Sequence, residues 1–211
     1  MKKVLTVLIC SVFIFTVSKA QDQGSSSGSP SNLHFGLKLA PIISWTTAEI
    51  DGLENDGSSV GFAYGLMMDF HFTDNYAFST GIELSHRSGK SKSDSLSFKY
   101  KFQYIDLPVA LKLSTNQIGY MKYFGKFGFL PGINVKATVD SDPGEKDTKI
   151  GSDINTFNMG LIVGAGAEYN ISGNTSLMVE LLYNNGFIDI LKTGNQQLKT
   201  NYFGINLGVY F

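Results

Sequence analysis

Residues 201–211 read NYFGINLGVYF, and this stretch decides the fold. Apolar side chains occupy the odd positions from Phe203 to Phe211, whereas Gly, Asn or Tyr occupies the even positions. Successive side chains of a β-strand point to opposite faces of the sheet. The period of two therefore predicts a strand with one apolar face and one small or polar face.

Phe211 closes this strand with an aromatic side chain. An aromatic residue in this place resembles the signal by which outer-membrane β-barrels are handed to their insertion machinery. Phe211 is therefore a candidate assembly signal, and the strand that it closes suggests a membrane β-barrel.

The first 20 residues have the pattern of a secretory leader. Lys2 and Lys3 precede an apolar run at residues 4–17, and Ser18 and Ala20 supply small residues before a cleavage site. The run is shorter than the roughly 20 residues of a spanning helix, and no later run reaches that length. We predict a signal peptide at residues 1–20, a Ser- and Gly-rich flexible periplasmic lead-in at residues 21–32, and a barrel domain at residues 33–211.

Composition narrows the class of protein. Of the 17 Lys and Arg residues, Lys2, Lys3 and Lys19 lie in the predicted leader, so 14 remain against 18 acidic residues. This balance provides no basic field for nucleic acid. Cys10 also lies in the leader, which excludes disulfides and Cys-ligated metals from the mature chain. The 23 Gly residues and the 13% aromatic content favour an all-β barrel.

Seven further alternating runs precede the C-terminal one. The fourth run changes parity between Phe102 and Leu107, so we predict a β-bulge at residues 104–106. Long polar connections alternate with short ones, as in membrane barrels with extracellular loops and tight periplasmic turns. The sequence predicts an all-β, eight-stranded, antiparallel, up-and-down transmembrane β-barrel with both termini in the periplasm. The runs span residues 33–43, 59–72, 76–87, 98–113, 120–137, 155–170 and 175–184; the long connections span 45–57, 88–97, 138–154 and 185–200, and the short ones 73–75, 114–118 and 172–174.

Charged residues fall almost entirely on one face of these runs. A Lys or Arg facing hydrocarbon at mid-membrane costs about 2 to 4 kcal/mol, so the charged face must line the lumen. Eight strands enclose a space that side chains just fill, which predicts a paired structural network and no open channel. The predicted lumen network comprises Lys38, Asp69, Glu83, Asp106, Lys112, Lys122, Lys126, Glu168 and Glu180, and the predicted interfacial aromatic girdles comprise Tyr64, Tyr76, Tyr123, Tyr169 and Tyr183.

The fourth run adds a motif to the periodic pattern. Residues 104–113 read YIDLPVALKL, which resembles the core of the PorT-like outer-membrane β-barrel family common in Bacteroidota. The resemblance covers about residues 33–211 and implies an outer-membrane barrel but little about activity. One member of that family takes part in protein export by the type IX route. Only Asp106, Pro108 and Lys112 transfer from the family, as a structural signature.

Three groups of residues permit a sharper interpretation. His34 and His71 could share a metal at the periplasmic end, although a polar rim is favoured because no third ligand is placed. His86, beside Ser88, could serve an enzyme acting on lipid, but one such pair is expected by chance in a polar segment. The acidic patch lacks the spacing of a calcium loop and is interpreted as solvated charge. This patch comprises Asp140, Asp142, Glu145, Asp147 and Asp153.

These observations favour an integral outer-membrane protein without catalytic residues, cofactor or metal. Its role would be structural, surface-binding or accessory to secretion. A narrow porin and a lipid-modifying enzyme remain as alternatives. The expected partners are outer-membrane lipid, the barrel-assembly machinery and a secretion or surface complex.

Overall fold

The computed structural model describes residues 32–49, 54–55, 57–93, 96–142, 144, 146–151, 154–173, 175–190 and 197–211. The predicted leader at residues 1–20 lies outside these described residues, as does the predicted lead-in up to residue 31. Across the described ranges, no helix is long and apolar enough to cross a bilayer.

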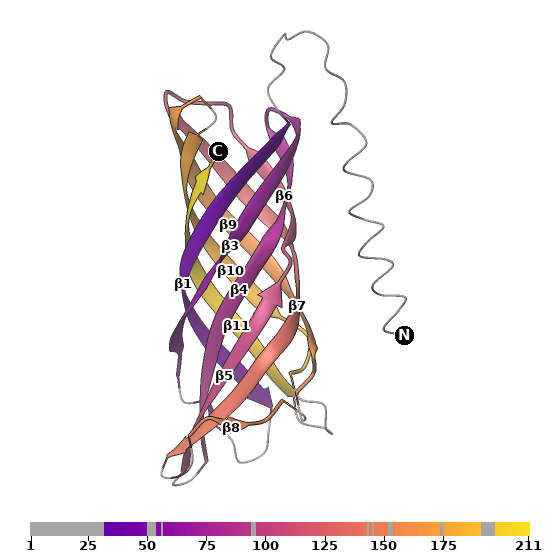
Figure 1. Ribbon diagram of the computed structural model, residues 1–211, viewed down its shortest axis with the longest axis vertical. Helices are drawn as coiled ribbons and strands as arrows, with labels where there is room; N and C mark the ends of the chain where they lie inside the picture. The colour runs from indigo at the N-terminus through magenta and orange to yellow at the C-terminus, as the bar shows by residue number, and fades with distance from the viewer. Residues whose placement is uncertain are drawn as a thin grey trace, which may run out of the picture. The chain divides into compact units, whose positions relative to one another are not determined.

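Antiparallel strands form the whole domain (Figure 1). Two strands of two residues, β2 and β8, add to the edges of β4 and β7. The strands are β1 (Leu33–Glu49), β2 (Glu54–Asn55), β3 (Ser59–Thr73), β4 (Tyr76–Ser93), β5 (Leu96–Asp106), β6 (Val109–Ser114), β7 (Met121–Asp142), β8 (Thr148–Lys149), β9 (Phe157–Ser172), β10 (Thr175–Gly186) and β11 (Gln197–Tyr210).

The sheet closes into a ring because β1 pairs with β3 on one side and with β11 on the other. Pairing of β1 with β11 runs from Gly36, opposite Tyr210, to Glu49, opposite Gln197. With β5 and β6 counted as one interrupted strand, the ring has eight members. The predicted eight-stranded, antiparallel, up-and-down barrel is confirmed, and its C-terminal strand is a full member of the wall.

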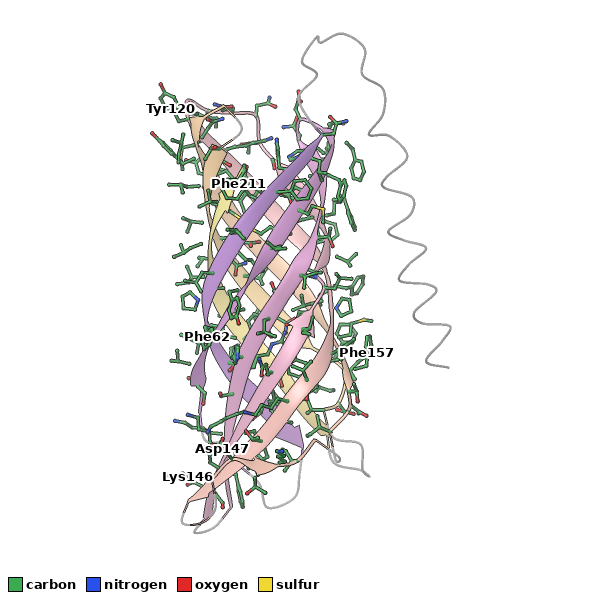
Figure 2. All side chains as sticks on the ribbon, in the orientation of Figure 1. Phe62, Tyr120, Lys146, Asp147, Phe157 and Phe211 are labelled. Atoms are coloured by element: carbon green, nitrogen blue, oxygen red, sulfur yellow. The ribbon has the colours of Figure 1, made fainter. Side chains whose placement is uncertain are left out.

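The faces of the wall are inverted relative to a soluble barrel. Phe129, Leu161 and Ile205 point outward and are 51%, 42% and 46% exposed. The side chains of Lys126 and Glu180 point inward, at 12% and 0% exposure. Figure 2 shows apolar side chains such as Phe62 and Phe157 projecting from the outer wall. An apolar outer wall around a polar interior is the arrangement that a lipid environment requires.

The fourth strand keeps its parity, so the predicted bulge at residues 104–106 is wrong. Phe102 and Tyr104 are buried on the inner face, the same face as Asp106 and Lys112. The strand is instead interrupted at Leu107 and Pro108, between β5 and β6. Proline has no N–H to donate to the ladder, which explains a break without a change of face.

The change of parity lies in β7. Gln103 faces Lys136 and Tyr104 faces Asn134, so Val135 is an extra residue on β7. Such a bulge moves the inner face from even positions, as at Asn134, to odd ones, as at the buried Ala137. Lys136 therefore lies on the outer wall, whereas unbroken alternation through the predicted run at residues 120–137 places its side chain inside; that expectation is wrong.

Several strands extend beyond the predicted ends of the runs. Within the predicted connection at residues 88–97, β4 and β5 stay paired as far as Ser93, opposite Leu96. Pairing of β1 with β11 similarly extends through Thr47, opposite Lys199. We call these paired extensions, together with that of β7 and β8, the ribbons. Polar composition suggested loops here, but a strand with water on both faces needs no apolar alternation. The opposite end of the barrel has short turns, as predicted, with β3 ending at Thr73 and β4 starting at Tyr76.

Because the apolar face of the wall points outward, a positive charge should destabilise the barrel to different extents at two outward-facing positions of β10. Leu181→Arg places a cation against the middle of the lipid and is expected to cost about 2 to 4 kcal/mol of the free energy of unfolding. Asn185→Arg, at the ribbon end of the same exposed face, is expected to cost about 0 to 1 kcal/mol. Denaturant titration of the protein folded in lipid vesicles measures both values, and equal costs would contradict the assignment of the outer wall.

Candidate functional site

The polar interior contains three groups of buried charges, which follow one another from the short-turn end toward the ribbon end of the barrel. The first surrounds Lys112, whose Nζ donates to Asp69 Oδ2 at 2.5 Å and to Glu168. It also donates to the hydroxyl of Tyr210 at 3.4 Å, and lies 4.5 Å from the ring centre of Phe124. Two carboxylates and two aromatic rings thus take the place of the water molecules that the ammonium group loses on burial.

The second group lies around Glu180. Its Oε2 accepts from Lys126 Nζ at 2.8 Å and from Asn206 Nδ2 at 2.6 Å, and the same Nζ forms an ion pair with Oε1 at 2.7 Å. An ion pair between Lys38 and Glu83 belongs to the same interior. The carboxylates of both pairs are almost fully buried, so each needs its cation to stay ionised.

The third group joins Arg87 to Asp106. Arg87 donates to Asp106 Oδ2, which also accepts from Ser85 Oγ at 2.6 Å. The guanidinium lies between the rings of Tyr104 and Tyr202, with centroids at 4.9 and 4.8 Å. Arg87 is absent from the predicted lumen network, although continuing the odd positions through Glu83 and Ser85 would have placed it inside.

Most of the predicted lumen residues meet one another in these groups. Lys122 is the exception, because its Nζ donates at 2.6 Å to the backbone carbonyl of Asp74 in a short turn. It lies at the mouth of the barrel and pairs with none of the predicted carboxylates in the part of the chain that the structure describes. The residues brought together are Lys38, Asp69, Glu83, Asp106, Lys112, Lys126, Glu168 and Glu180.

A pocket of about 170 Å³ lies at the same mouth. His34 and His71 line it with ring centroids 4.6 Å apart in an edge-to-face arrangement, and Lys122 and Glu168 complete its charged lining. Among the described residues, no group of three His, Cys, Asp or Glu side chains is arranged to hold a metal ion. The pocket is lined mainly by polar side chains of the barrel's rim and lies next to the Lys112 group.

His86 lies on the outer wall and faces away from the interior. Its ring stacks on Phe62, with centroids 4.4 Å apart and planes at 18°, and Tyr64 continues the stack. Its neighbour Arg87 points to the opposite face. Ser88 bonds through its backbone to Ser44 Oγ, and His86 Nδ1 has no hydrogen-bond partner within the described residues. The geometry assembles no Ser–His pair at this place.

The acidic patch of the predicted connection at residues 138–154 is only partly described, since Glu145 and Asp153 lie outside the described residues. Asp140 and Asp147 both bind Lys101 Nζ, at 2.7 and 3.1 Å. The amide of Asp147, which has a left-handed φ of 56°, donates to Asp140 Oδ1 at 2.8 Å. The hydrogen bond from Lys101 holds the pKa of Asp140 below its usual value. These two carboxylates are oriented toward a lysine.

Aromatic side chains gather on the outer wall at both ends of the apolar band. Trp45, which the sequence analysis did not single out, packs against Phe203 at 5.6 Å, and Phe203 packs against Tyr183 at 4.8 Å. At the short-turn end Tyr120 contacts Tyr169 at 6.0 Å. Rings of this kind prefer the headgroup layer of a membrane. The predicted girdle residues Tyr64, Tyr76, Tyr123 and Tyr169 are exposed, and Tyr183 is partly exposed.

Phe211 lies at the short-turn end of the wall (Figure 2). Its amide donates to the carbonyl of Phe35 at 2.8 Å, and its side chain is exposed on the outer wall. The ring is thus available to another molecule, whereas the backbone is held in the ladder.

Comparison with known proteins supports this architecture. Residues 19–192 match the family described as outer membrane protein beta-barrel domain. No curated protein matches the chain. Among solved structures, Neisserial surface protein A is similar over 85% of this chain and 96% of its own, with a TM-score of 0.51 and 17% identity. This likeness concerns the fold alone.

Two further barrels resemble the chain less well. The attachment invasion locus protein of Yersinia pestis is 15% identical over 85% of this chain and 97% of its own, with a TM-score of 0.46. The outer membrane protein OprG from Pseudomonas aeruginosa is 11% identical over 84% of this chain and 95% of its own, also with a TM-score of 0.46.

The interior ion pairs predict an asymmetric response to mutation. Arg87→Met leaves the buried Asp106 carboxylate without its cation and is expected to cost about 3 to 5 kcal/mol of the free energy of unfolding. The double variant Arg87→Met/Asp106→Leu removes both charges and is expected to cost less than the single variant. Denaturant titration in vesicles measures the two, and a larger loss in the double variant would refute the account of this pair.

Proposed function

The chain belongs to the family of outer membrane protein β-barrel domains, and we propose that it works in that membrane as a non-conducting, non-catalytic barrel that presents a binding surface. The single observation behind this proposal is the filled lumen. Arg87, Lys112 and Glu180 are buried and ion-paired at successive levels of the interior. An eight-stranded barrel has little room beyond its own side chains, which argues against solute passage.

The orientation in the membrane follows from the ends of the barrel. Short turns of such barrels face the periplasm and long connections face outward. By this rule the turn at residues 73–76 and Phe211 lie on the periplasmic side. The paired ribbons of β4 with β5 and of β7 with β8 then extend outside the cell, where they offer a surface to a partner.

We further propose, from the motif of its fourth strand, that the chain belongs to the PorT-like group. Asp106 is held by Arg87, Lys112 is held by Asp69, and Pro108 separates β5 from β6. Each signature residue therefore has a structural task, which supports interpreting the motif as part of the scaffold. This resemblance would imply an accessory role in secretion. A partner protein that co-purifies stably with the chain from solubilised outer membranes would support that role.

The alternatives have weaker support. A narrow porin would require an unfilled interior. A lipid-modifying enzyme would require a nucleophile beside His86, whereas that ring stacks on Phe62. The carboxylates of Glu83, Asp106 and Glu180 are bound by cations inside the barrel, where no substrate could reach them.

The filled lumen predicts that the purified protein forms no channel. Reconstituted into a planar lipid bilayer, it is expected to produce no discrete current steps above those of a protein-free detergent preparation. Reproducible unitary steps from folded protein would replace this proposal with the porin alternative.

Export and assembly give a second prediction. We propose that the leader at residues 1–20 directs export and that the barrel-assembly machinery recognises Phe211. Deleting Phe211 should lower the folded fraction in outer membranes, since the exposed ring is lost while the strand remains. Phe211→Tyr keeps an aromatic ring and serves as the control. Heat-dependent gel migration reports the folded fraction, and an unchanged fraction after deletion would rule out this role.

A further inference from the structure

The outer wall formed by β4, β5 and β7 changes abruptly from apolar to basic. The strand register places Leu84 opposite Ile105, and Ile105 opposite Ile133, so these three residues form one apolar row across the wall. Ile105 and Ile133 are 45% and 52% exposed, as expected for side chains that face lipid. This row is the last one before the ribbons in which the residues of all three strands are apolar.

The next rows toward the ribbons are polar. His86 lies opposite Gln103, which lies opposite Lys136. One row further, Lys101 lies opposite Ser88 and Thr138. Two residues along a strand span about 7 Å, which a tilt of about 45° reduces to roughly 5 Å along the membrane normal. The polar rows therefore begin within the headgroup layer that borders the hydrocarbon.

Lysines concentrate on the polar rows of β4, β5, β7 and β8, and we call this part of the outer wall the basic wall. Acidic residues share this face: Asp140 and Asp147 are both bound to Lys101, and the register places Asp140 opposite Lys99 and Asp142 opposite Ser97. The other lysines of the wall make no ion pair with a described residue. The basic wall comprises Lys90, Lys99, Lys101, Lys136 and Lys149.

Two features indicate that an anion belongs here. Lys90 lies directly opposite Lys99 on the ladder, and like charges in this position destabilise a sheet. Asp140 lies opposite Lys99 on the other side, but its carboxylate is bound to Lys101. Beside them is a pocket of about 240 Å³ whose lining includes His86, Lys101 and Lys136, together with the Lys101-bound Asp147. A pocket of that size can hold a phosphate with part of the sugar that bears it.

The basic wall occupies one side of the barrel. At the matching level of β1 and β11, Trp45 lies opposite Asn201, and Thr47 lies opposite Lys199. In the described part of β1, β10 and β11, Lys199 is the one lysine besides the inward-pointing Lys38. A general need for positive charge at the membrane surface would distribute lysines on all sides, so the asymmetry favours a particular ligand.

We propose that the basic wall binds the phosphate groups of an anionic glycolipid of the outer leaflet. The acyl chains of that lipid would lie along the apolar row ending at Leu84, Ile105 and Ile133. Its sugar and phosphates would then meet Lys136, Lys101 and the Lys90–Lys99 pair in turn. Basic side chains at this depth are the usual attraction for anionic headgroups. The inference depends on the membrane placement and not on whether the ribbons bind a protein.

The test uses the full folded protein in detergent and purified lipid A as the probe, with and without its phosphates. Lys99→Gln/Lys136→Gln removes two charges from exposed positions of the basic wall. Lys99→Arg/Lys136→Arg retains both charges, and Lys122→Gln/Lys199→Gln removes two charges elsewhere. Native mass spectrometry measures the bound lipid, and heat-dependent gel migration confirms that each variant is folded.

The Gln variant is expected to lose roughly tenfold or more of its affinity for phosphorylated lipid A, while the Arg variant and the control keep theirs. Dephosphorylated lipid A is expected to bind all four proteins weakly and alike. Equal binding of the two lipids, or an equal loss in the control variant, would overturn the proposal. Tighter binding of a soluble sulfated oligosaccharide than of lipid A would also overturn it, in favour of a ligand outside the membrane.

Discussion

A backbone inside hydrocarbon has no water to bond with, and this constraint underlies the rest of the structure. A sheet meets it only by closing, so β1 must find β11 at the far end of the chain. Closure removes every edge in the membrane and leaves side chains alone to decide which face contacts lipid. On the closing strand β11, Phe203, Ile205 and Leu207 alternate with glycine and asparagine. The face that carries these three apolar side chains is therefore the one that contacts lipid.

Closure at eight strands has a second consequence, because it creates an interior with room only for side chains. The charges excluded from the lipid face collect there and must neutralise one another. Lys112 with Asp69, Lys126 with Glu180 and Arg87 with Asp106 do so at successive levels. A barrel filled in this way offers its outer wall and ribbons for contact with other molecules. Those surfaces are the ones that a partner or a lipid can reach.

The strengths and failures of the sequence interpretation have one origin. The period of two is local, so the eight wall strands and most of their faces were predictable. The bulge could not be placed, because the aromatic Phe102 and Tyr104 look lipid-facing although they fill the interior beside Arg87. The true bulge at Val135 depends on pairing with Gln103 and Tyr104 from another strand. The polar ribbons were interpreted as loops because strands with both faces in water show no alternation.

The amino-acid sequence alone was enough to predict a membrane barrel, its approximate strands and the side of the wall on which most of the charges lie, since these depend on near neighbours and on the cost of charge in lipid. Only the tertiary structure decided which charges meet. Lys112 and Tyr210 are 98 residues apart, and Lys112 and Glu168 are 56 apart, yet all three share one level of the lumen. It likewise brought Lys90, Lys99 and Lys136 onto one wall, because register and curvature arise only when the whole ring is closed.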